Sequence, residues 1–145
     1  MPIITCPKCN IANRVPLEKE EIQGKCGRCG HQLPTFSLRH VFELNDHDFS
    51  SFLATYRDLL VLVDFYSHAC GPCQAIAPVI AQLPRKFGPR LAVSKMDTGR
   101  NPITAGKFQI QGVPTLLFFR NIHKIDAIVG APSVEALHRH IQRLL

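Results

Sequence analysis

The sequence of 145 residues contains no run of apolar residues approaching the ~20 that a bilayer-spanning helix needs. Its first residues also lack the basic stretch and the apolar segment of an export signal. We therefore expect no membrane span and no export, and place the chain in a reducing cytoplasm. There, paired cysteines more often ligate metals or act as redox dithiols than form structural disulfides.

Long basic runs are also lacking, although the formal net charge is +6. The positive excess is shared between residues 1–36 and residues 37–145, and the chain has no internal repeat beyond its cysteine pairs. A dispersed surplus of this kind indicates a solvated surface. It does not favour a nucleic-acid-binding protein, in which basic residues cluster on one face or along a helix.

What the sequence does contain is six cysteines, all in C-x-x-C pairs. Two pairs lie within residues 1–36, a polar segment whose few large apolar residues cannot form an adequate core, so we expect something to staple it. Four thiolates presented by two turns suit tetrahedral Zn²⁺ and leave no open coordination position. We therefore predict one structural zinc ion per chain, with iron in the same site as the main alternative and two disulfides as a less favoured one. The predicted metal ligands are Cys6, Cys9, Cys26 and Cys29.

Residues 37–145 alternate between strand-like and helix-like patterns. Strands are expected at residues 41–44, 59–63, 91–96, 115–119 and 125–129. Helices are expected after Asn45 or Asp46, from near Cys73, between Asn101 and Phe108, and after Ser133. This order predicts an α/β fold with a central mixed sheet flanked by helices. The chain would then comprise a small zinc-ribbon-like module, residues 1–36, and a domain of residues 37–145.

The third pair, Cys70 and Cys73, follows an apolar strand and opens a helix, which is the context of a redox motif. A helix N-terminus stabilises a thiolate, so we predict that Cys70 is the nucleophile at an exposed edge. Cys73, about one turn deeper, would resolve the mixed disulfide. Asp64 ends the preceding strand, where burial raises the pKa of a carboxyl group, and it is placed either to accept the Cys73 proton or simply to be satisfied by local hydrogen bonds. Lys95 on the neighbouring strand is placed to tune that carboxylate.

Several motifs stand in the order and spacing of thioredoxin, namely residues 63–66, 70–73, 77–78, 95, 112–115 and 129–131. Over about residues 40–145 the chain resembles the thioredoxin family, and its zinc module is similar to that of the bacterial thioredoxin 2 class. The resemblance implies a thioredoxin fold and the roles given above to Cys70, Cys73 and Asp64. It also implies that Pro114 lies beside the dithiol with a cis Val113–Pro114 bond, which sequence alone does not favour.

The resemblance further implies a flat apolar groove that receives an extended segment of an oxidised protein. The groove residues would be Gly71, Pro72, Val113, Thr115 and Gly130. An NADPH-dependent thioredoxin reductase would supply electrons, and no organic cofactor would be bound. The family usually has Trp immediately before the first cysteine, whereas this chain has His68 and Ala69 there and no Trp anywhere. We expect the exchange chemistry to persist and binding to partners built around that aromatic to weaken.

These observations predict an enzyme, a protein-disulfide reductase of the cytoplasm. One alternative is a redox sensor or chaperone-like protein in which the zinc thiolates are the switch. Another is a zinc-ribbon adaptor for nucleic acid with a vestigial redox domain. The intact Cys70–Cys73 pair and Asp64 favour the enzyme, because a sensor needs neither. The adaptor would need basic and aromatic residues clustered in its module, which contains a single aromatic residue, Phe36.

Overall fold

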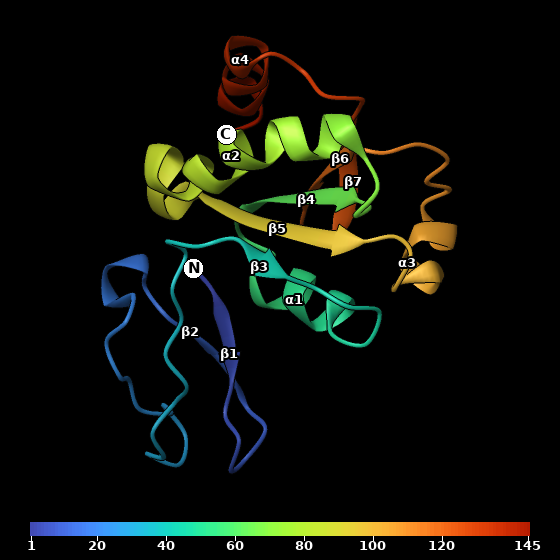
Figure 1. Ribbon diagram of the computed structural model, residues 1–145. Coiled ribbons are helices and arrows are strands. Elements are labelled where there is room, and N and C mark those ends of the chain that lie inside the picture. The colour runs from blue at the N-terminus through green and yellow to red at the C-terminus, as the bar shows by residue number, and fades with distance from the viewer.

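The computed structural model describes all 145 residues, in which a two-stranded module precedes a five-stranded sheet with helices (Figure 1). The module contains β1 (Ile3–Thr5) and β2 (Ala12–Arg14), which pair antiparallel, and the 3₁₀ turn η1 (Leu17–Lys19). No helix of the chain is both long and apolar enough to span a membrane.

The larger sheet has the strand order β3-β5-β4-β6-β7. Its strands are β3 (Phe42–Glu43), β4 (Leu60–Tyr66), β5 (Leu91–Asp97), β6 (Thr115–Arg120) and β7 (His123–Val129). β3, β5 and β4 run parallel to one another. β6 pairs antiparallel with β4, and β7 pairs antiparallel with β6. Central β4 is apolar along nearly its whole length because both of its faces are covered. The predicted central mixed sheet is confirmed.

Helices cover both faces of this sheet. They are α1 (Phe49–Thr55), α2 (Gly71–Phe87), α3 (Pro102–Lys107) and α4 (Val134–Leu144), with a 3₁₀ turn η2 (Gly88–Arg90) after α2. In Figure 1, α2 and α4 lie on one side of the sheet, and α1 lies on the other side together with the module. Each side has its own cluster of buried apolar residues, so the sheet separates two cores.

The module and the domain share one of these cores. Four apolar residues of the module are buried in the same cluster as α1, namely Ile4, Val15, Leu33 and Phe36. Polar contacts reinforce the junction, since Arg14 pairs with Asp58 and the Glu20 carboxylate accepts the backbone N–H of Leu38. The module therefore draws part of its apolar packing from the domain.

The start of α1 differs from the sequence-based expectation. Its cap residue is Asp48, not Asn45 or Asp46. The Asn45 side chain instead accepts the N–H groups of His47 and Asp48, at 2.8 and 2.9 Å, in a turn that precedes the helix. Asp46 accepts the backbone N–H of Thr104 at the start of α3, at 2.8 Å. Asp46 is therefore engaged elsewhere. The Asn45 side chain does make the contacts of an N-cap, but for the turn that leads into α1, and the Asn45 carbonyl accepts the N–H of Phe49 at 3.1 Å.

Other element ends also differ from their expected positions, and β7 begins at His123, two residues ahead of the expected start. β4 continues to Tyr66 because its pairing with β5 extends to the partners Tyr66 and Asp97, so Asp64 lies within the strand and not at its end. α2 begins at Gly71, ahead of the expected start near Cys73. The last two helices agree with the prediction, with Asn101 at the start of α3 and the Ser133 side chain capping α4.

Candidate active site and metal centre

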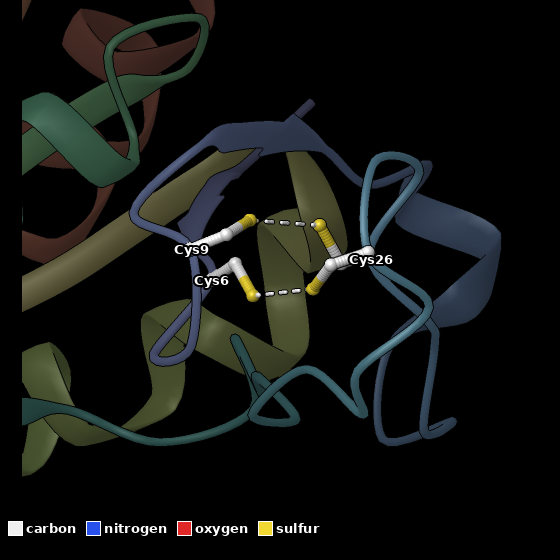
Figure 2. Close-up of side chains that lie close together, drawn as sticks. Cys6, Cys9 and Cys26 are labelled. Carbon is white, nitrogen blue, oxygen red and sulfur yellow. Dashed lines mark hydrogen bonds between the residues drawn. The ribbon is translucent and has the colours of Figure 1, made fainter.

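The four cysteines of the module converge on one point. Their Sγ atoms all lie within 4.8 Å of one another, and Figure 2, in which Cys6, Cys9 and Cys26 are labelled, shows them facing one another across two loops. The Sγ atoms of Cys6 and Cys29 are 3.6 Å apart, and those of Cys9 and Cys26 are 3.7 Å apart. Four sulfurs at about 2.3 Å from a zinc ion would be about 3.8 Å apart, so the arrangement fits a tetrahedral four-thiolate metal site.

Each cysteine pair of the module sits at the tip of a hairpin. The backbone N–H of Cys6 donates to the Ile11 carbonyl at 2.9 Å, and that of Cys26 donates to the His31 carbonyl at 2.8 Å. The backbone N–H groups of Cys29 and Arg28 lower the pKa of the Cys26 thiol to about 6. The loop backbone therefore favours the thiolate at Cys26, the form that a metal requires. The backbone N–H of Ile11 lowers the pKa of Cys9, but desolvation and the three neighbouring thiols outweigh it and raise that pKa to about 11.

Asn13 on β2 connects the two tips. Its Oδ1 accepts the backbone N–H of Gly27 at 3.0 Å, and its Nδ2 lies 3.6 Å from the Sγ of Cys26. Asn13 could not be identified from the sequence, because a single Asn in a short strand has no spacing pattern that distinguishes it. Residues of this kind orient the ligands of a metal site and are part of its function.

The third cysteine pair, Cys70 and Cys73, lies where β4 passes into α2. Cys70 is the N-cap residue, and Pro72 occupies the first turn, where its missing N–H costs nothing. Cys70 and Cys73 form a disulfide with their Cα atoms 5.2 Å apart. The backbone N–H of Cys73 is directed at the Sγ of Cys70 at 3.1 Å. At most helix N-termini this N–H donates to a side-chain oxygen of the N-cap residue. Here it points at sulfur, where it stabilises negative charge once the pair is reduced.

The exposure of this dithiol differs from the prediction. Cys70 is only 8 % exposed and Cys73 is 4 % exposed, so neither forms an exposed edge in the disulfide state. The loop before β6 covers the pair, and the carbonyl oxygen of Val113 lies 3.6 Å from the Sγ of Cys70. Cys70 is still the more accessible of the two, in the order that its expected role requires.

The covering loop contains the cis Val113–Pro114 bond that the family resemblance implied. The carbonyl of Pro114 accepts the N–H of Gly130 at 2.8 Å, and the φ of 93° at Gly130 suits glycine alone. Val113, Pro114 and Gly130 are thus brought together beside Cys70. Thr115 is buried, and its hydroxyl donates to the Gly112 carbonyl at 2.6 Å, so it supports the loop from behind the groove.

Asp64 lies below the dithiol and is 4 % exposed. Its Oδ1 accepts no hydrogen bond from the chain, so local hydrogen bonds do not satisfy it. It faces a hollow of about 330 Å³ that Cys73 and Lys95 also line. Burial raises the pKa of Asp64 to about 6, with the charge of Lys95 opposing the rise and that of Glu43 adding to it. A carboxyl group able to exchange a proton near neutral pH therefore shares a hollow with Cys73.

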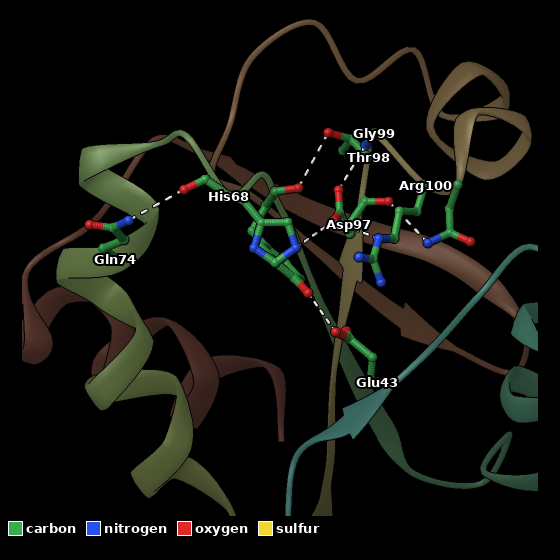
Figure 3. A network of polar contacts seen from close by, with 9 residues as sticks. Glu43, His68, Gln74, Asp97, Thr98, Gly99 and Arg100 are labelled. Atoms are coloured by element: carbon green, nitrogen blue, oxygen red, sulfur yellow. Dashed lines mark hydrogen bonds and ion pairs between the residues drawn. The ribbon is translucent and has the colours of Figure 1, made fainter.

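His68, which precedes Ala69 and the dithiol, is held at the end of β5 (Figure 3). Its Nε2 lies 2.9 Å from the Oδ2 of Asp97, and its carbonyl accepts the side-chain amide of Gln74 at 3.3 Å. The imidazole also meets the Tyr66 ring edge-on, with the centroids 5.8 Å apart. These contacts hold the His68 side chain against Asp97 and Tyr66. The residue next to Cys70 is the exposed Ala69.

Two residues around the hollow, Glu43 and Tyr66, could not be assigned a role from the sequence. The Tyr66 hydroxyl donates to the Glu43 carboxylate, and Glu43 stands opposite Lys95 in the pairing of β3 with β5. Both residues line the hollow that Asp64 faces. The pairing of β5 with both β3 and β4 brings Glu43 and Tyr66 there, and no local pattern in the sequence specifies that register.

A dithiol at a helix N-terminus, next to a buried carboxyl group, can exchange its disulfide with that of another molecule. These features define the class of thiol–disulfide oxidoreductases. Comparison with known protein families identifies the family within this class. The family model described as thioredoxin matches residues 40–143, and the chain belongs to the thioredoxin family. A model described as the N-terminal part of thioredoxin 2 matches residues 5–31, which contain the four clustered cysteines.

Individual relatives agree with both matches. The chain is 37% identical over 143 residues to thioredoxin C-3 of Corynebacterium nephridii, covering 99% of this chain and 95% of that one. It is 37% identical over 95 residues to thioredoxin of Bacillus subtilis, covering 66% and 91% of the two chains. An M-type chloroplastic thioredoxin of Spinacia oleracea is 34% identical over 109 residues, or 75% and 60% of the two chains. The chain is accordingly a protein-disulfide reductase.

Proposed function

We propose that the chain reduces disulfides of oxidised cytoplasmic proteins, with Cys70 as the attacking thiolate and Cys73 as the resolving thiol. The observation that supports this assignment is the Cys73 N–H aimed at the Cys70 sulfur, 3.1 Å away at the helix N-terminus. A thiolate at Cys70 gains from that donor and from the helix dipole. Cys73 gains from neither, and it lines the hollow that contains Asp64.

The exchange proceeds in two balanced steps. The Cys70 thiolate attacks one sulfur of the substrate disulfide, and the other substrate sulfur leaves as a thiolate. Asp64 then accepts the proton of Cys73, and the Cys73 thiolate attacks the Cys70 sulfur. The Cys70–Cys73 disulfide forms while the second substrate sulfur leaves as a thiolate. Two electrons pass to the substrate, whose thiolates take one proton from Asp64 and one from water.

An extended segment of the substrate would lie in the groove beside the dithiol. We propose Gly71, Pro72, Val113 and Gly130 as its contacts, with Pro114 holding the Val113 side of the groove close to Cys70. Val129, next to Gly130, is 78 % exposed and offers further apolar surface to a partner. Lys95 would act on the second step through the charge that it presents to Asp64.

The electron donor in this proposal is an NADPH-dependent thioredoxin reductase, and the compartment is the cytoplasm. The four cysteines of the module can ligate a metal only as thiolates, a form that a reducing compartment preserves. The bacterial thioredoxins among the relatives are consistent with this compartment. We further propose that residues 1–36 and 37–145 divide the work between metal binding and exchange.

We propose zinc as the metal, one ion per chain, held by Cys6, Cys9, Cys26 and Cys29. When bound, zinc would supply folding free energy to the module through four metal–sulfur bonds. Four protein ligands leave no position for a substrate, so no step of the exchange requires the metal. The module's two short strands and shared core are consistent with a structural ion.

A trapping experiment tests the assignment of the two thiols. Cys73→Ser should accumulate mixed disulfides with an oxidised protein substrate, because attack by Cys70 continues and resolution stops. Cys70→Ser should accumulate none. Mass spectrometry of the non-reduced adduct identifies the bonded cysteine, and NADPH-coupled turnover with a thioredoxin reductase provides the native control. Adducts on Cys73 in the Cys70→Ser chain, with none on Cys70 in the other variant, would reverse the two roles.

A further inference from the structure

Three charged residues form a row across the sheet beneath the dithiol. Glu43 on β3 is paired with Lys95 on β5, and Lys95 is paired with Asp64 on β4. Paired residues on neighbouring strands project from the same face of a sheet, with about 4.8 Å between strands. Along the row, Glu43 is exposed at the sheet edge, Lys95 is half-buried and Asp64 is buried. The lysine therefore stands between two carboxylates.

The outer carboxylate of this row is held in place. The Tyr66 hydroxyl donates to Glu43, and the Nζ of Lys95 lies 5.5 Å from the centroid of the Tyr66 ring. All three side chains line the same hollow as Asp64 and Cys73. Glu43 is thus fixed beside the lysine and does not move freely in solvent, although its position at a sheet edge would allow that.

We propose that Glu43 is a positioning residue for the second step of the exchange: it shares the positive charge of Lys95 with Asp64 and so keeps Asp64 able to take the Cys73 proton. This proposal rests on the proposed role of Asp64 as the proton acceptor. A lysine charge alone favours the ionised carboxylate and makes it a weaker base, whereas a second negative charge nearby opposes that effect. Glu43 itself touches neither the substrate nor the reacting sulfur atoms.

The titratable groups that face Asp64 come from every element around the hollow. They are Glu43 from β3, Lys95 from β5, Tyr66 from β4, His68 from the following loop and Cys73 from α2. Of these, the charges of Lys95 and Glu43 act on the pKa of Asp64, in opposite directions. Glu43→Gln removes one charge at nearly constant size, so the pKa of Asp64 should fall by about half to one unit. The weaker base should slow the resolving step about two- to threefold.

The experiment uses the full-length, metal-loaded chain and two readouts. Carboxyl ¹³C NMR follows the titration of Asp64 in the reduced protein. Stopped-flow measurement follows resolution of a mixed disulfide between Cys70 and a small aromatic thiol as a function of pH. Glu43→Gln should move both midpoints to lower pH, and Lys95→Met should move the Asp64 midpoint to higher pH. Tyr66→Phe, which releases Glu43 and keeps its charge, should give a smaller shift in the direction of Glu43→Gln.

Glu135→Gln on α4 is the matched control, since it removes an exposed carboxylate remote from the hollow. It should leave both midpoints where they are in the native chain. An unchanged Asp64 midpoint in a folded Glu43→Gln chain would overturn the proposal. Asp64→Asn distinguishes failure of the role proposed for Asp64 from failure of the role proposed for Glu43. If it resolves the mixed disulfide at the native rate, the role of Asp64 is wrong. If it is slow while Glu43→Gln matches the native chain, only the role of Glu43 is wrong.

Discussion

All three C-x-x-C pairs begin with the same backbone turn and continue differently. The N–H of the residue after the second cysteine donates to the carbonyl of the first cysteine in each pair. The donors are Asn10, Gly30 and Gln74, at 2.9, 2.9 and 3.1 Å. Asn10 and Gly30 then adopt left-handed conformations, with φ of 62° and 75°, whereas Gln74 continues the 17-residue helix α2.

That one residue distinguishes the two module pairs, the proposed metal ligands, from the pair at the start of α2. A left-handed residue ends a helical turn and sends the chain back, and Asn and Gly are the residues that adopt this conformation at little cost. In the module the chain therefore returns as a hairpin, and both sulfurs point towards the opposite loop. After Cys73 the helix continues, so its aligned peptide dipoles act on Cys70. The motif itself is common to both outcomes, and the residue after it differs.

The largest expected effects come from replacing one cysteine of each centre in turn and measuring both turnover and zinc content. Cys70→Ser should reduce protein-disulfide turnover by at least about a thousandfold, because the nucleophile is gone, and should leave the zinc content unchanged. Cys26→Ser should lose most of the zinc, and the fraction of this variant that folds should keep its disulfide-exchange activity. Metal analysis and a reductase-coupled assay on both variants measure the two effects. Loss of zinc from Cys70→Ser would show that the two centres are one functional unit.

The buried carboxyl group of the redox region should be visible in the stability of the oxidised chain. The pKa of Asp64 is raised from 3.8 to about 6, so the folded state binds the proton more tightly than the unfolded state. The native chain should therefore lose stability as the pH rises from about 4 to 6, with a full cost of about 3 kcal/mol above that range. Asp64→Asn should remove this cost.

Chemical denaturation of the oxidised native and Asp64→Asn chains at pH 4 and pH 8 measures this difference. The variant should be more stable than the native chain at pH 8 and close to it at pH 4. Glu135→Gln, which changes an exposed carboxylate, is the control and should show no such pH dependence. Equal stability of the native and Asp64→Asn chains at both pH values would show that Asp64 is solvated in solution.

The order of helices and strands could be predicted because their apolar periods are local. The apolar run of residues 59–63 and the helical spacing after Ser133 depend on neighbouring residues alone. Element ends depend on partners in space. β4 continues past Asp64 to Tyr66 because β5 is there to pair with it, and Asn45 forms a turn of its own ahead of α1.

The residues of the candidate site could likewise be predicted where the signal is local, and not where it depends on partners in space. The clustering of the four module cysteines followed from their spacing, since each pair closes a short turn. Asn13, Glu43 and Tyr66 could not be found from the sequence because their partners lie on other strands or loops. The contact between His68 and Asp97 likewise depends on where β5 ends. Sequence spacing therefore predicts candidate ligands and nucleophiles better than it predicts the residues placed to orient them.

Gly30→Ala tests the role of the left-handed residue directly. A Cβ at Gly30 would meet no atom within 4 Å, so the cost of the change is backbone strain alone, about 1–2 kcal/mol. Zinc affinity should therefore fall by about five- to thirtyfold, as measured by competition with a chelator. Gly106→Ala in α3 is the matched control, because Gly106 is also open to an added Cβ but helical, and it should leave zinc affinity unchanged. Unaltered zinc affinity in Gly30→Ala would show that the metal, not the turn residue, sets the hairpin.

The smallest expected effect concerns Ala69, the exposed residue that stands where the family usually has tryptophan. Attack and resolution need two thiols, a proton acceptor and access, and none of these requires an indole. Ala69→Trp adds apolar surface next to Cys70, so it should lower KM for a thioredoxin reductase by about three- to tenfold and change kcat by less than about twofold. Ala81→Trp, at an exposed position further along α2, is the control for a general gain in stickiness. A native chain without turnover that Ala69→Trp restores would show that the aromatic residue belongs to the chemistry and not only to docking.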